Sequence, residues 1–509
     1  MMTTASLSVL AALSPLERYL GSLWADDPFR GLYHLTGFDL LVVVPYFAIL
    51  LTLSFYGLHR YRLIYLYRKY RHHQPPTAVP LTEWPRVTIQ LPLFNEKYVV
   101  ERLIAAVAAI DYPRERLEIQ VLDDSTDDTV ELARAAVECH AARGVPIRHL
   151  HRSHRTGYKA GALAEGLRKA EGEFIAVFDA DFLPPPDFLR RTVPCFADPR
   201  VGMVQTRWTF LNRNYSLFTR VQAILLDGHF VLEHGARSRA DLFFNFNGTA
   251  GIWRRAAIES AGGWHHDTLT EDTDLSYRAQ LAGWKFLYLP EVECPSELPV
   301  EMNAFKAQQA RWAKGLMQTA KKILPQVLRA PLPWQVKLEA FWHLTSGISY
   351  PLMVALSLVL LPAMIVRFYQ GWWQVLWIDL PLVLAATGSV SSFYLVAQKE
   401  LYPQRWGRTF FLLPLLMAVG IGVALRNTRA VLEALWGVPS AFVRTPKYQL
   451  GSRRQPWYTQ VYRSTDLKWL PWVELSLGGY FAWAVVYAFT NQHYGTIPFL
   501  GLFLAGYCY

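Results

Sequence analysis

Two aspartates that could hold a metal ion, Asp179 and Asp181, directly follow the apolar run Phe174-Ile-Ala-Val-Phe. The run predicts a buried strand, so both carboxylates lie where a strand passes into a loop and can turn toward one hard cation. Mg²⁺ or Mn²⁺ takes one or two protein carboxylates and completes its shell with water and phosphate oxygens. Such an ion neutralises the charge that builds on a departing diphosphate. The pair therefore predicts a metal-diphosphate site, although this short pattern also occurs in ordinary loops.

A second acidic motif, Thr270-Glu-Asp272, precedes an amphipathic helical pattern over residues 275–282. In a cleft, burial and neighbouring acids raise the pKa of a carboxyl group, and Asp272 could then take a proton from an acceptor hydroxyl as a general base. In the other interpretation, Thr270 caps the helix and the acids complement its dipole. The two can hold together, and the sequence leaves both open.

Gln308, Arg311 and Trp312, in the motif QQARW, share one face of a predicted helix. The arginine can clamp phosphate oxygens, the glutamine can bond a sugar or diphosphate, and the tryptophan offers a flat face to a sugar ring. The alternative is a surface arginine beside a core tryptophan. Lys159, in RTGYKAG, can reach a phosphate or a base, or can be a solvated lysine at a helix start.

The elements that must position these residues form an α/β pattern. Apolar runs at residues 87–93, 117–122 and 174–178 read as strands separated by helical patterns. Alternating strands and helices predict a mainly parallel sheet, in which ligands bind beyond the carboxyl ends of the strands. Asp123 and Asp124 follow the second of these strands as the DxD pair follows the third. Both acidic clusters should therefore share one cleft.

The composition places this domain in a membrane protein. The chain has 509 residues, is 52% hydrophobic and only 18% charged, and carries a formal charge of +10. This excludes a disordered chain and a single small domain. The four cysteines are scattered, with no disulfide framework or zinc spacing. The positive charges lie mostly on loops flanking apolar segments, which favours a membrane over nucleic acid.

The apolar segments and their flanking charges predict the membrane topology. The first apolar segment, residues 38–58, is followed at once by Arg60, Arg62, Arg68, Lys69 and Arg71. Because positive charges favour the cytoplasmic side, the N-terminus should lie outside and the chain should enter the cytoplasm. The predicted order is an external segment (1–37), a transmembrane helix (38–58), a cytoplasmic catalytic domain with interfacial helices near its end (59–340), two transmembrane helices (343–366 and 373–397), an interfacial helix with a loop (409–455), a transmembrane helix (467–489) and a partial apolar segment (497–509).

Six motifs together resemble a known family. DDSTDD, HRTGYKAGAL, FDADF, FNGTAGIWR, TEDTDL and QQARW occur in the order found in cellulose-synthase-like processive glycosyltransferases, over residues 87–314. FNGTAGIWR and QTRWTFLN look closest to the plant-type branch that makes β-1,4-mannan, glucomannan or the xyloglucan-backbone glucan. The resemblance implies a GT-A fold, an inverting transfer and a dependence on Mg²⁺ or Mn²⁺.

The resemblance also implies roles at the matching positions. The implied donor-binding residues are Asp123 and Asp124 for the nucleoside, Lys159 for the nucleotide or its phosphates, Asp179 and Asp181 for the metal-bound diphosphate, and Gln308 and Arg311. The implied acceptor-binding residues are Trp312, Phe246, Asn247, Gly248 and Thr249. Asp272 would be the general base, and Thr445 and Lys447 would belong to a gating segment. The gating segment follows the apolar stretch from Phe410, for which the charge pattern alone predicts a helix that lies in the cytoplasmic interface of the membrane or dips in and out of it.

These expectations point to a membrane polysaccharide synthase. It would add hexose, from UDP-glucose first or from GDP-mannose close behind, to a growing polysaccharide and pass the polymer through the bilayer. One alternative is a non-processive transferase that glycosylates a lipid, as ceramide glucosyltransferases do. A transporter or scaffold that only binds nucleotide sugar is disfavoured because it has no need of a TED base. The sequence leaves the sugar, the linkage and any partner subunit open.

Overall fold

The computed structural model describes residues 36–73, 83–368, 378–440, 444–449 and 469–509. Predictions that fall on the other residues lie outside this description. These include nearly all of the external N-terminal segment, the start of the predicted helix at 373–397 and much of the loop before residue 469.

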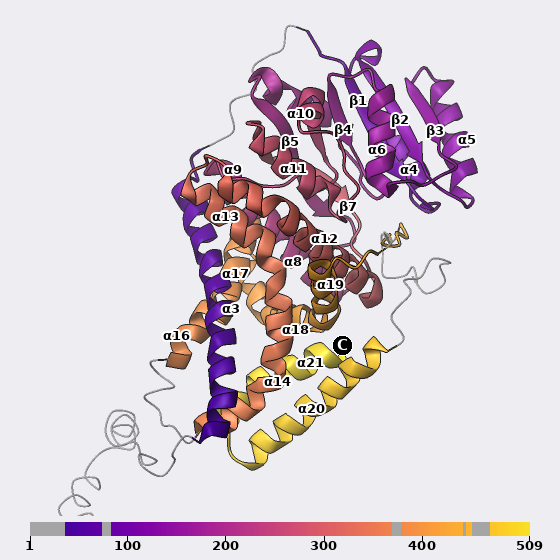
Figure 1. The fold of residues 1–509 in the computed structure, drawn as a ribbon. Helices are drawn as coiled ribbons and strands as arrows, with labels where there is room; N and C mark the ends of the chain where they lie inside the picture. Colours follow the sequence, from indigo (N-terminus) through magenta and orange to yellow (C-terminus); the bar gives the residue numbers. More distant parts are fainter. Residues whose placement is uncertain (1–35, 74–82, 369–377, 441–443, 450–468) are drawn as a thin grey trace, which may run out of the picture.

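A seven-stranded mixed sheet forms the centre of the upper domain in Figure 1, in the order β3-β2-β1-β4-β6-β5-β7. The strands are β1 (Val87–Leu93), β2 (Leu117–Asp123), β3 (Ile147–His151), β4 (Phe174–Val177), β5 (Val201–Phe210), β6 (Gly251–Arg254) and β7 (Lys285–Ser296). The first four are parallel, β6 runs antiparallel to β4 and β5, and β5 pairs in parallel with β7. The predicted mainly parallel sheet is confirmed.

Apolar side chains fill both faces of this sheet. In β4, Phe174 and Ala176 belong to the core cluster shared with α4 (Val100–Ala108) and α5 (Thr129–Ala141). Ile175 and Val177 belong to the opposite cluster, with α6 (Tyr158–Lys169), α10 (Arg255–Ser260) and α11 (Glu271–Leu281). Because side chains alternate along a strand, a short run that is apolar at every position can be buried on both faces.

In the described part of the chain, four helical stretches are long and apolar enough to cross a membrane: Asp39–Lys69 within α3 (Gly37–Lys69); Trp334–Arg367, through α13 (Trp334–Thr345) and α14 (Ser349–Phe368); Leu380–Leu401, through α16 (Leu380–Val383) and α17 (Ser389–Leu401); and Leu470–Thr490 as α20. The second begins nine residues before the predicted span, since α13 continues it toward the domain that contains the sheet. A shorter apolar helix, Tyr494–Cys508, contains α21 (Ile497–Cys508).

The segment predicted to be interfacial contains two helices bent by 42° at a break between Trp406–Gly422 and Ala424–Trp436. The first includes α18 (Leu413–Gly422), and the second is α19. Neither α18 nor α19 alone spans the roughly 30 Å of a hydrocarbon core at about 1.5 Å per residue. Arg426, Arg429 and Glu433 also put charge on α19. The interfacial placement stays a prediction.

Several helices lie between the sheet and the apolar helices (Figure 1). The longest is α12 (Met302–Arg329), which packs against α11, α13 and α19. Another run comprises α8 (Leu217–Gly228), the π-helix η3 (His229–His234) and α9 (Gly235–Arg239), and it contacts α3 and α17. The domain built on the sheet and the apolar helices therefore share an extensive packed boundary.

Candidate active site

One cleft at the carboxyl ends of β1, β2 and β4 gathers residues from all six motifs and from the C-terminal part of the chain. Its lining includes Glu96, Asp124, Arg155, Lys159, Asp179, Asp181, Asn247, Gly248, Glu271, Asp272, Glu297, Gln308, Arg311, Trp312, Arg444, Thr445 and Lys447. The shared cleft expected from the strand ends is therefore present.

The DxD pair is held by two lysines. Lys159 Nζ lies 2.5 Å from Asp179 Oδ1, and Lys447 Nζ contacts Asp181 Oδ1. Burial alone would lower the pKa of Lys159, but the surrounding carboxylates, above all that of Asp179, outweigh it and leave the pKa raised. The pKa of Lys447 is raised in the same way, chiefly by Asp181. Both lysines are therefore cationic and complement the acidic floor of the cleft.

The residues around the DxD pair fit a hard divalent cation. Asp179 and Asp181, two positions apart, supply two carboxylates from one loop, and Glu96 lines the same cleft. Such an all-oxygen set suits Mg²⁺ or Mn²⁺, which need only one or two carboxylates when phosphate and water complete the shell. Asp179 and Asp181 would hold the ion, with Lys159 and Lys447 placed to meet phosphate oxygens beside it.

Asp272 lies in the first turn of α11, with its carboxylate against the loop of Asn247 and Gly248. A Cβ atom added to Gly248 would lie 3.0 Å from Asp272 Oδ2, and Gly248 has a φ of +80°. Glycine is therefore required there both for the backbone conformation and for the space beside the carboxylate. Burial, reinforced by the neighbouring Glu271, raises the pKa of Asp272 to about 7, against the opposing charge of Lys159. Such a pKa suits a general base near neutral pH.

The prediction that the Thr270 side chain caps α11 is wrong. The Thr270 hydroxyl makes no hydrogen bond to the start of α11 and instead lies 3.2 Å from the hydroxyl of Thr319 on α12. The acids do occupy the first turn of the helix, where the dipole favours them. Thr270 thus ties α11 to α12, the helix that carries the QQARW motif.

Gln308, Arg311 and Trp312 line the cleft from α12, so the alternative of a surface arginine beside a core tryptophan is wrong. Burial lowers the pKa of Arg311, and the carboxylates of Glu271 and Asp272 oppose this effect. A guanidinium so placed adds a fixed positive charge next to the proposed base.

The FNGT loop only partly follows the prediction. Asn247 and Gly248 line the cleft, whereas Phe246 and Thr249 are fully buried behind it. The Phe246 ring packs edge-on against Trp253, at 5.6 Å between ring centroids. The Thr249 hydroxyl accepts a 2.8 Å hydrogen bond from the Asp179 backbone N–H. These two residues hold the loop against the sheet and the DxD turn rather than facing an acceptor.

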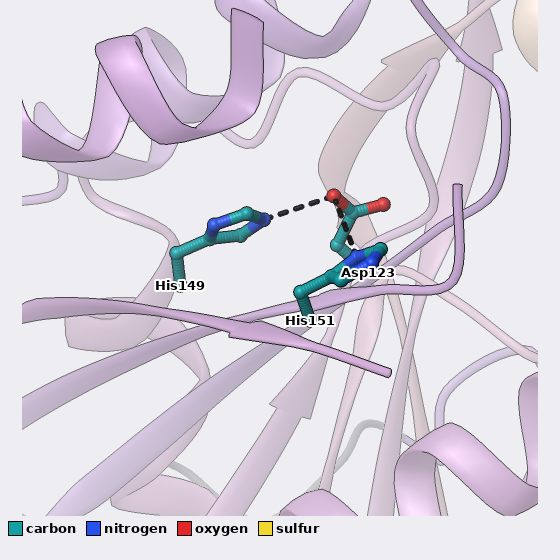
Figure 2. Close-up of side chains that lie close together, drawn as sticks. All are labelled: Asp123, His149 and His151. Carbon is teal, nitrogen blue, oxygen red and sulfur yellow. Dashed lines mark hydrogen bonds and ion pairs between the residues drawn. The ribbon is translucent and has the colours of Figure 1, made fainter. Parts of the chain in front are cut away.

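In the first acidic pair, Asp123 and Asp124, only the second residue lines the cleft. Asp123 is fully buried and is absent from the cleft lining. Its Oδ2 lies 2.9 Å from His149 Nε2 and 3.7 Å from His151 Nδ1 (Figure 2). Burial favours the neutral acid, but hydrogen bonds from His149 and Ser125 outweigh it and lower the pKa of Asp123. The predicted nucleoside contact of Asp123 is therefore corrected: its carboxylate braces β2 against β3.

Asp124 does line the cleft, and Arg152 holds its carboxylate through Nε at 2.6 Å and Nη2 at 2.5 Å. The sequence interpretation missed Arg152, His149 and His151. The alternation of Ile147-Arg-His-Leu-His151 along β3 could have indicated that both histidines share one face.

The segment for which the family resemblance implies a gating role lies at the cleft, and the gating role itself stays a prediction. Thr445 and Lys447 both line the cleft, although they lie far from the catalytic motifs in sequence. Arg444 Nη1 is 3.3 Å from Glu96 Oε2, and the Gln449 N–H donates to Glu297 Oε2 at 3.0 Å. Burial raises the pKa of Glu96 to about 8 despite the nearby Arg444 and Lys447. The sequence interpretation missed Glu96, Glu297 and Arg444 as anchors of this segment.

Comparisons with known proteins agree with this geometry. Residues 85–315 match the family model described as glycosyltransferase like family 2. Glucomannan 4-beta-mannosyltransferase 2 of Arabidopsis thaliana is 47% identical over 254 residues, covering 49% of this chain and 47% of that protein. Probable glucomannan 4-beta-mannosyltransferase 11 of Oryza sativa subsp. japonica is 41% identical over 336 residues, covering 62% of this chain and 57% of that protein. The chain thus spans about half the length of these curated relatives.

A solved structure shares the fold: the mannosyltransferase PcManGT of Pyrobaculum calidifontis, in complex with GDP-Man and Mn²⁺. Its TM-score is 0.51 at 23% identity, and the match covers 77% of this chain and 99% of that one. The resemblance to cellulose-synthase-like glycosyltransferases of the plant-type branch is confirmed. Residues 85–315 match the family model of the family 2 glycosyltransferases, and the domain that they form has a GT-A-like fold.

Proposed function

We propose that this chain is a membrane-integrated, inverting mannosyltransferase that uses GDP-mannose to extend a β-1,4-linked mannan or glucomannan. The observation that carries the proposal is the single cleft in which the carboxylate of Asp272 lies with the DxD pair and Arg311. A binding-only domain has no need of a half-buried cleft carboxylate whose pKa is raised to about 7.

The choice of mannose rests on the relatives. The plant proteins are named glucomannan mannosyltransferases, and PcManGT was solved with GDP-Man. They support the GDP-mannose alternative better than the UDP-glucose that the sequence interpretation put first. The acceptor would be the non-reducing end of the growing chain, between Trp312 and the loop of Asn247.

Inversion needs one base and one displacement. Asp272 would take the proton from the attacking acceptor hydroxyl as that oxygen bonds to the anomeric carbon and the GDP–sugar bond breaks. Lys159, Arg311 and Lys447 would hold the diphosphate and balance its charge. A Mg²⁺ or Mn²⁺ ion held by Asp179 and Asp181 would act as a Lewis acid on the leaving diphosphate.

The membrane part of the proposal rests on the helices that pack below this domain. Among the described residues, four stretches are long and apolar enough to cross a bilayer, and α12 connects the cleft to them through its contacts with α13 and α19. We propose that the catalytic domain lies on the cytoplasmic side, with the N-terminus outside, and that the polymer leaves through these helices. A lipid glycosyltransferase is the second candidate.

The donor is tested with the purified full chain in lipid vesicles, supplied with Mn²⁺ and equal concentrations of GDP-mannose, GDP-glucose or UDP-glucose. Incorporation of labelled sugar from GDP-mannose should exceed that from UDP-glucose by about 100-fold or more, because a site that hydrogen-bonds one donor leaves its polar groups unpaired with another. Comparing GDP-glucose with the other two donors separates recognition of the nucleobase from recognition of the hexose. Incorporation from UDP-glucose alone would overturn the mannosyltransferase proposal.

A further inference from the structure

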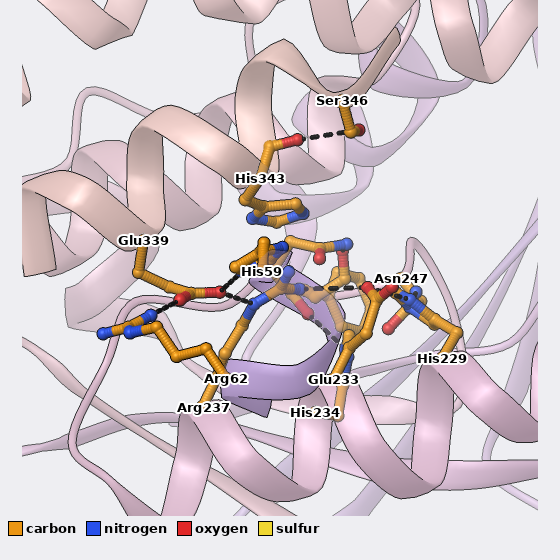
Figure 3. A network of polar contacts seen from close by, with 12 residues as sticks. His59, Arg62, His229, Glu233, His234, Arg237, Asn247, Glu339, His343 and Ser346 are labelled. Carbon is orange, nitrogen blue, oxygen red and sulfur yellow. Dashed lines mark hydrogen bonds and ion pairs between the residues drawn. The ribbon is translucent and has the colours of Figure 1, made fainter. Parts of the chain in front are cut away.

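A continuous set of buried and half-buried polar contacts joins the first apolar helix to the loop of Asn247 (Figure 3). On α13, Glu339 Oε1 lies 2.9 Å from His59 Nε2 of α3 and accepts a 3.0 Å hydrogen bond from Arg237 Nε of α9. Arg62, also on α3, contacts the second oxygen of Glu339. Glu339 is fully buried and Arg237 is 2% exposed, so this junction is held out of water.

The contacts continue from Arg237 to the cleft. Arg237 Nη1 donates to Glu233 Oε2 at 3.2 Å, and the same oxygen lies 3.0 Å from His229 Nδ1. The other ring nitrogen, His229 Nε2, lies 2.9 Å from Asn247 Nδ2. His229 and Glu233 belong to η3, and π-helical turns of this kind are frequent at functional sites.

The chemistry of these groups fixes the orientation of Asn247. Burial disfavours the ionised form of Glu233, but the charge of Arg237 and the hydrogen bond from His229 outweigh it and hold its pKa well below the usual range. An ionised carboxylate can only accept, so His229 carries its proton on Nδ1, and in the neutral ring Nε2 accepts from Asn247 Nδ2. The Asn247 backbone N–H, donating to Gln205 Oε1 at 2.9 Å, fixes the residue from the other side.

In this orientation the side-chain oxygen of Asn247 has no partner among the described residues. Among the described residues, Asn247 Oδ1 is buried and accepts no hydrogen bond, although Asn247 lines the cleft. A buried acceptor left unsatisfied costs free energy, which a ligand hydroxyl would recover. The same loop carries the Gly248 carbonyl, bonded at 2.9 Å to Lys159 Nζ, and the glycine that packs against Asp272.

We propose that Asn247 Oδ1 accepts a hydrogen bond from a hydroxyl of the acceptor sugar, and that His229, Glu233 and Arg237 are positioning residues that hold this amide from the Glu339 junction. The inference rests on the proposed function, because it assigns the loop to the acceptor. It ties the geometry of the acceptor site to packing at the helices through which the polymer would leave.

The test uses the full chain in vesicles with GDP-mannose and mannan oligosaccharide, and compares H229F, H229Q, N247A and the double variant H229F/N247A. Phenylalanine keeps the ring and removes both hydrogen bonds, whereas glutamine keeps an acceptor. H229F should reduce kcat/KM for the oligosaccharide about 10- to 100-fold, the loss typical of leaving a buried polar group unpaired. The KM for GDP-mannose and its slow hydrolysis without acceptor should stay within about two-fold.

The double variant decides whether His229 acts through Asn247. If it does, H229F/N247A should be within about two-fold of N247A alone, and H229Q should recover most of the activity lost in H229F. Multiplicative losses in the double variant, or an equal loss in GDP-mannose hydrolysis, would overturn the inference. H140F, on the surface of α5, is the matched control. Failure of the wild type to transfer mannose would instead reject the proposed function.

Discussion

Replacing Asp272 with asparagine is expected to reduce mannosyl transfer by roughly 10²- to 10⁴-fold, the contribution typical of a positioned general base. Asparagine has nearly the same shape but cannot take the proton of the attacking hydroxyl. The measurement is the initial rate of label incorporation from GDP-mannose, together with GDP affinity by titration. GDP affinity should change little, because the diphosphate would be held by Lys159, Arg311 and Lys447.

The pH profile separates a lost base from a damaged site. Burial, reinforced by Glu271, raises the pKa of Asp272 to about 7, so its carboxyl is protonated and inactive as a base below that pH. The wild-type rate should therefore rise with pH through about 7, and the residual rate of D272N should lack this rise. D267N, at an exposed carboxylate on the loop before α11, is the control and should keep the wild-type rate. Retention of more than about a tenth of the activity by D272N would show that another group is the base.

Removing divalent metal is expected to cause the second large loss. Chelation with excess EDTA should reduce transfer by about 100-fold or more, since a Lewis acid on a leaving diphosphate contributes several kcal/mol. Mn²⁺ or Mg²⁺ added back should restore the rate. The measurement is incorporation during EDTA treatment and subsequent metal titration, with bound metal quantified in the same samples.

Two variants locate the metal effect in the DxD pair. D181N should remain impaired even in millimolar Mn²⁺ and should need more Mn²⁺ for half-maximal activity, because one carboxylate ligand is lost. D198N changes a carboxylate that pairs with Arg200 before β5, away from the cleft lining, and should behave as wild type. Full activity in protein shown to be free of divalent metal would contradict the assignment of Asp179 and Asp181.

The strands that carry the site could be predicted from the sequence almost residue by residue. The strand predicted at residues 87–93 is β1, and the predicted strands at 117–122 and 174–178 differ from β2 and β4 by a single residue. Such runs are apolar at every position because both faces of the sheet are covered, and a parallel arrangement puts their acidic ends at one edge. That geometry is what brought Asp124 and Asp179 into the predicted cleft.

The parts that failed depend on packing that a motif does not record. Phe246 lies within a functional motif, but its ring belongs to the core beside Trp253. Asp123 occupies a strand-end position, but its carboxylate is hydrogen-bonded to His149 of the neighbouring strand. A local pattern shows that a side chain lies near a site, and only the neighbouring elements decide whether it faces the cleft.

Contacts between distant segments could not be foreseen at all. The junction at Glu339 unites residues from three helices, with His59 280 positions away in the chain. Lys447 likewise meets Asp181 only after the chain has passed through the apolar helices. The motif order indicates which residues belong to the catalytic domain, but the pairing of these buried charges follows from how the helices pack beneath it.

The most direct test of the central claim is the identity of the product. The full chain in lipid vesicles, with Mn²⁺ and labelled GDP-mannose, should yield long chains that an endo-β-1,4-mannanase degrades to labelled oligosaccharides. D272N measured in parallel should yield at least about 100-fold less of this product. A single labelled sugar attached to an extractable lipid, resistant to the mannanase, would contradict the polymer synthase and identify the chain as a lipid glycosyltransferase.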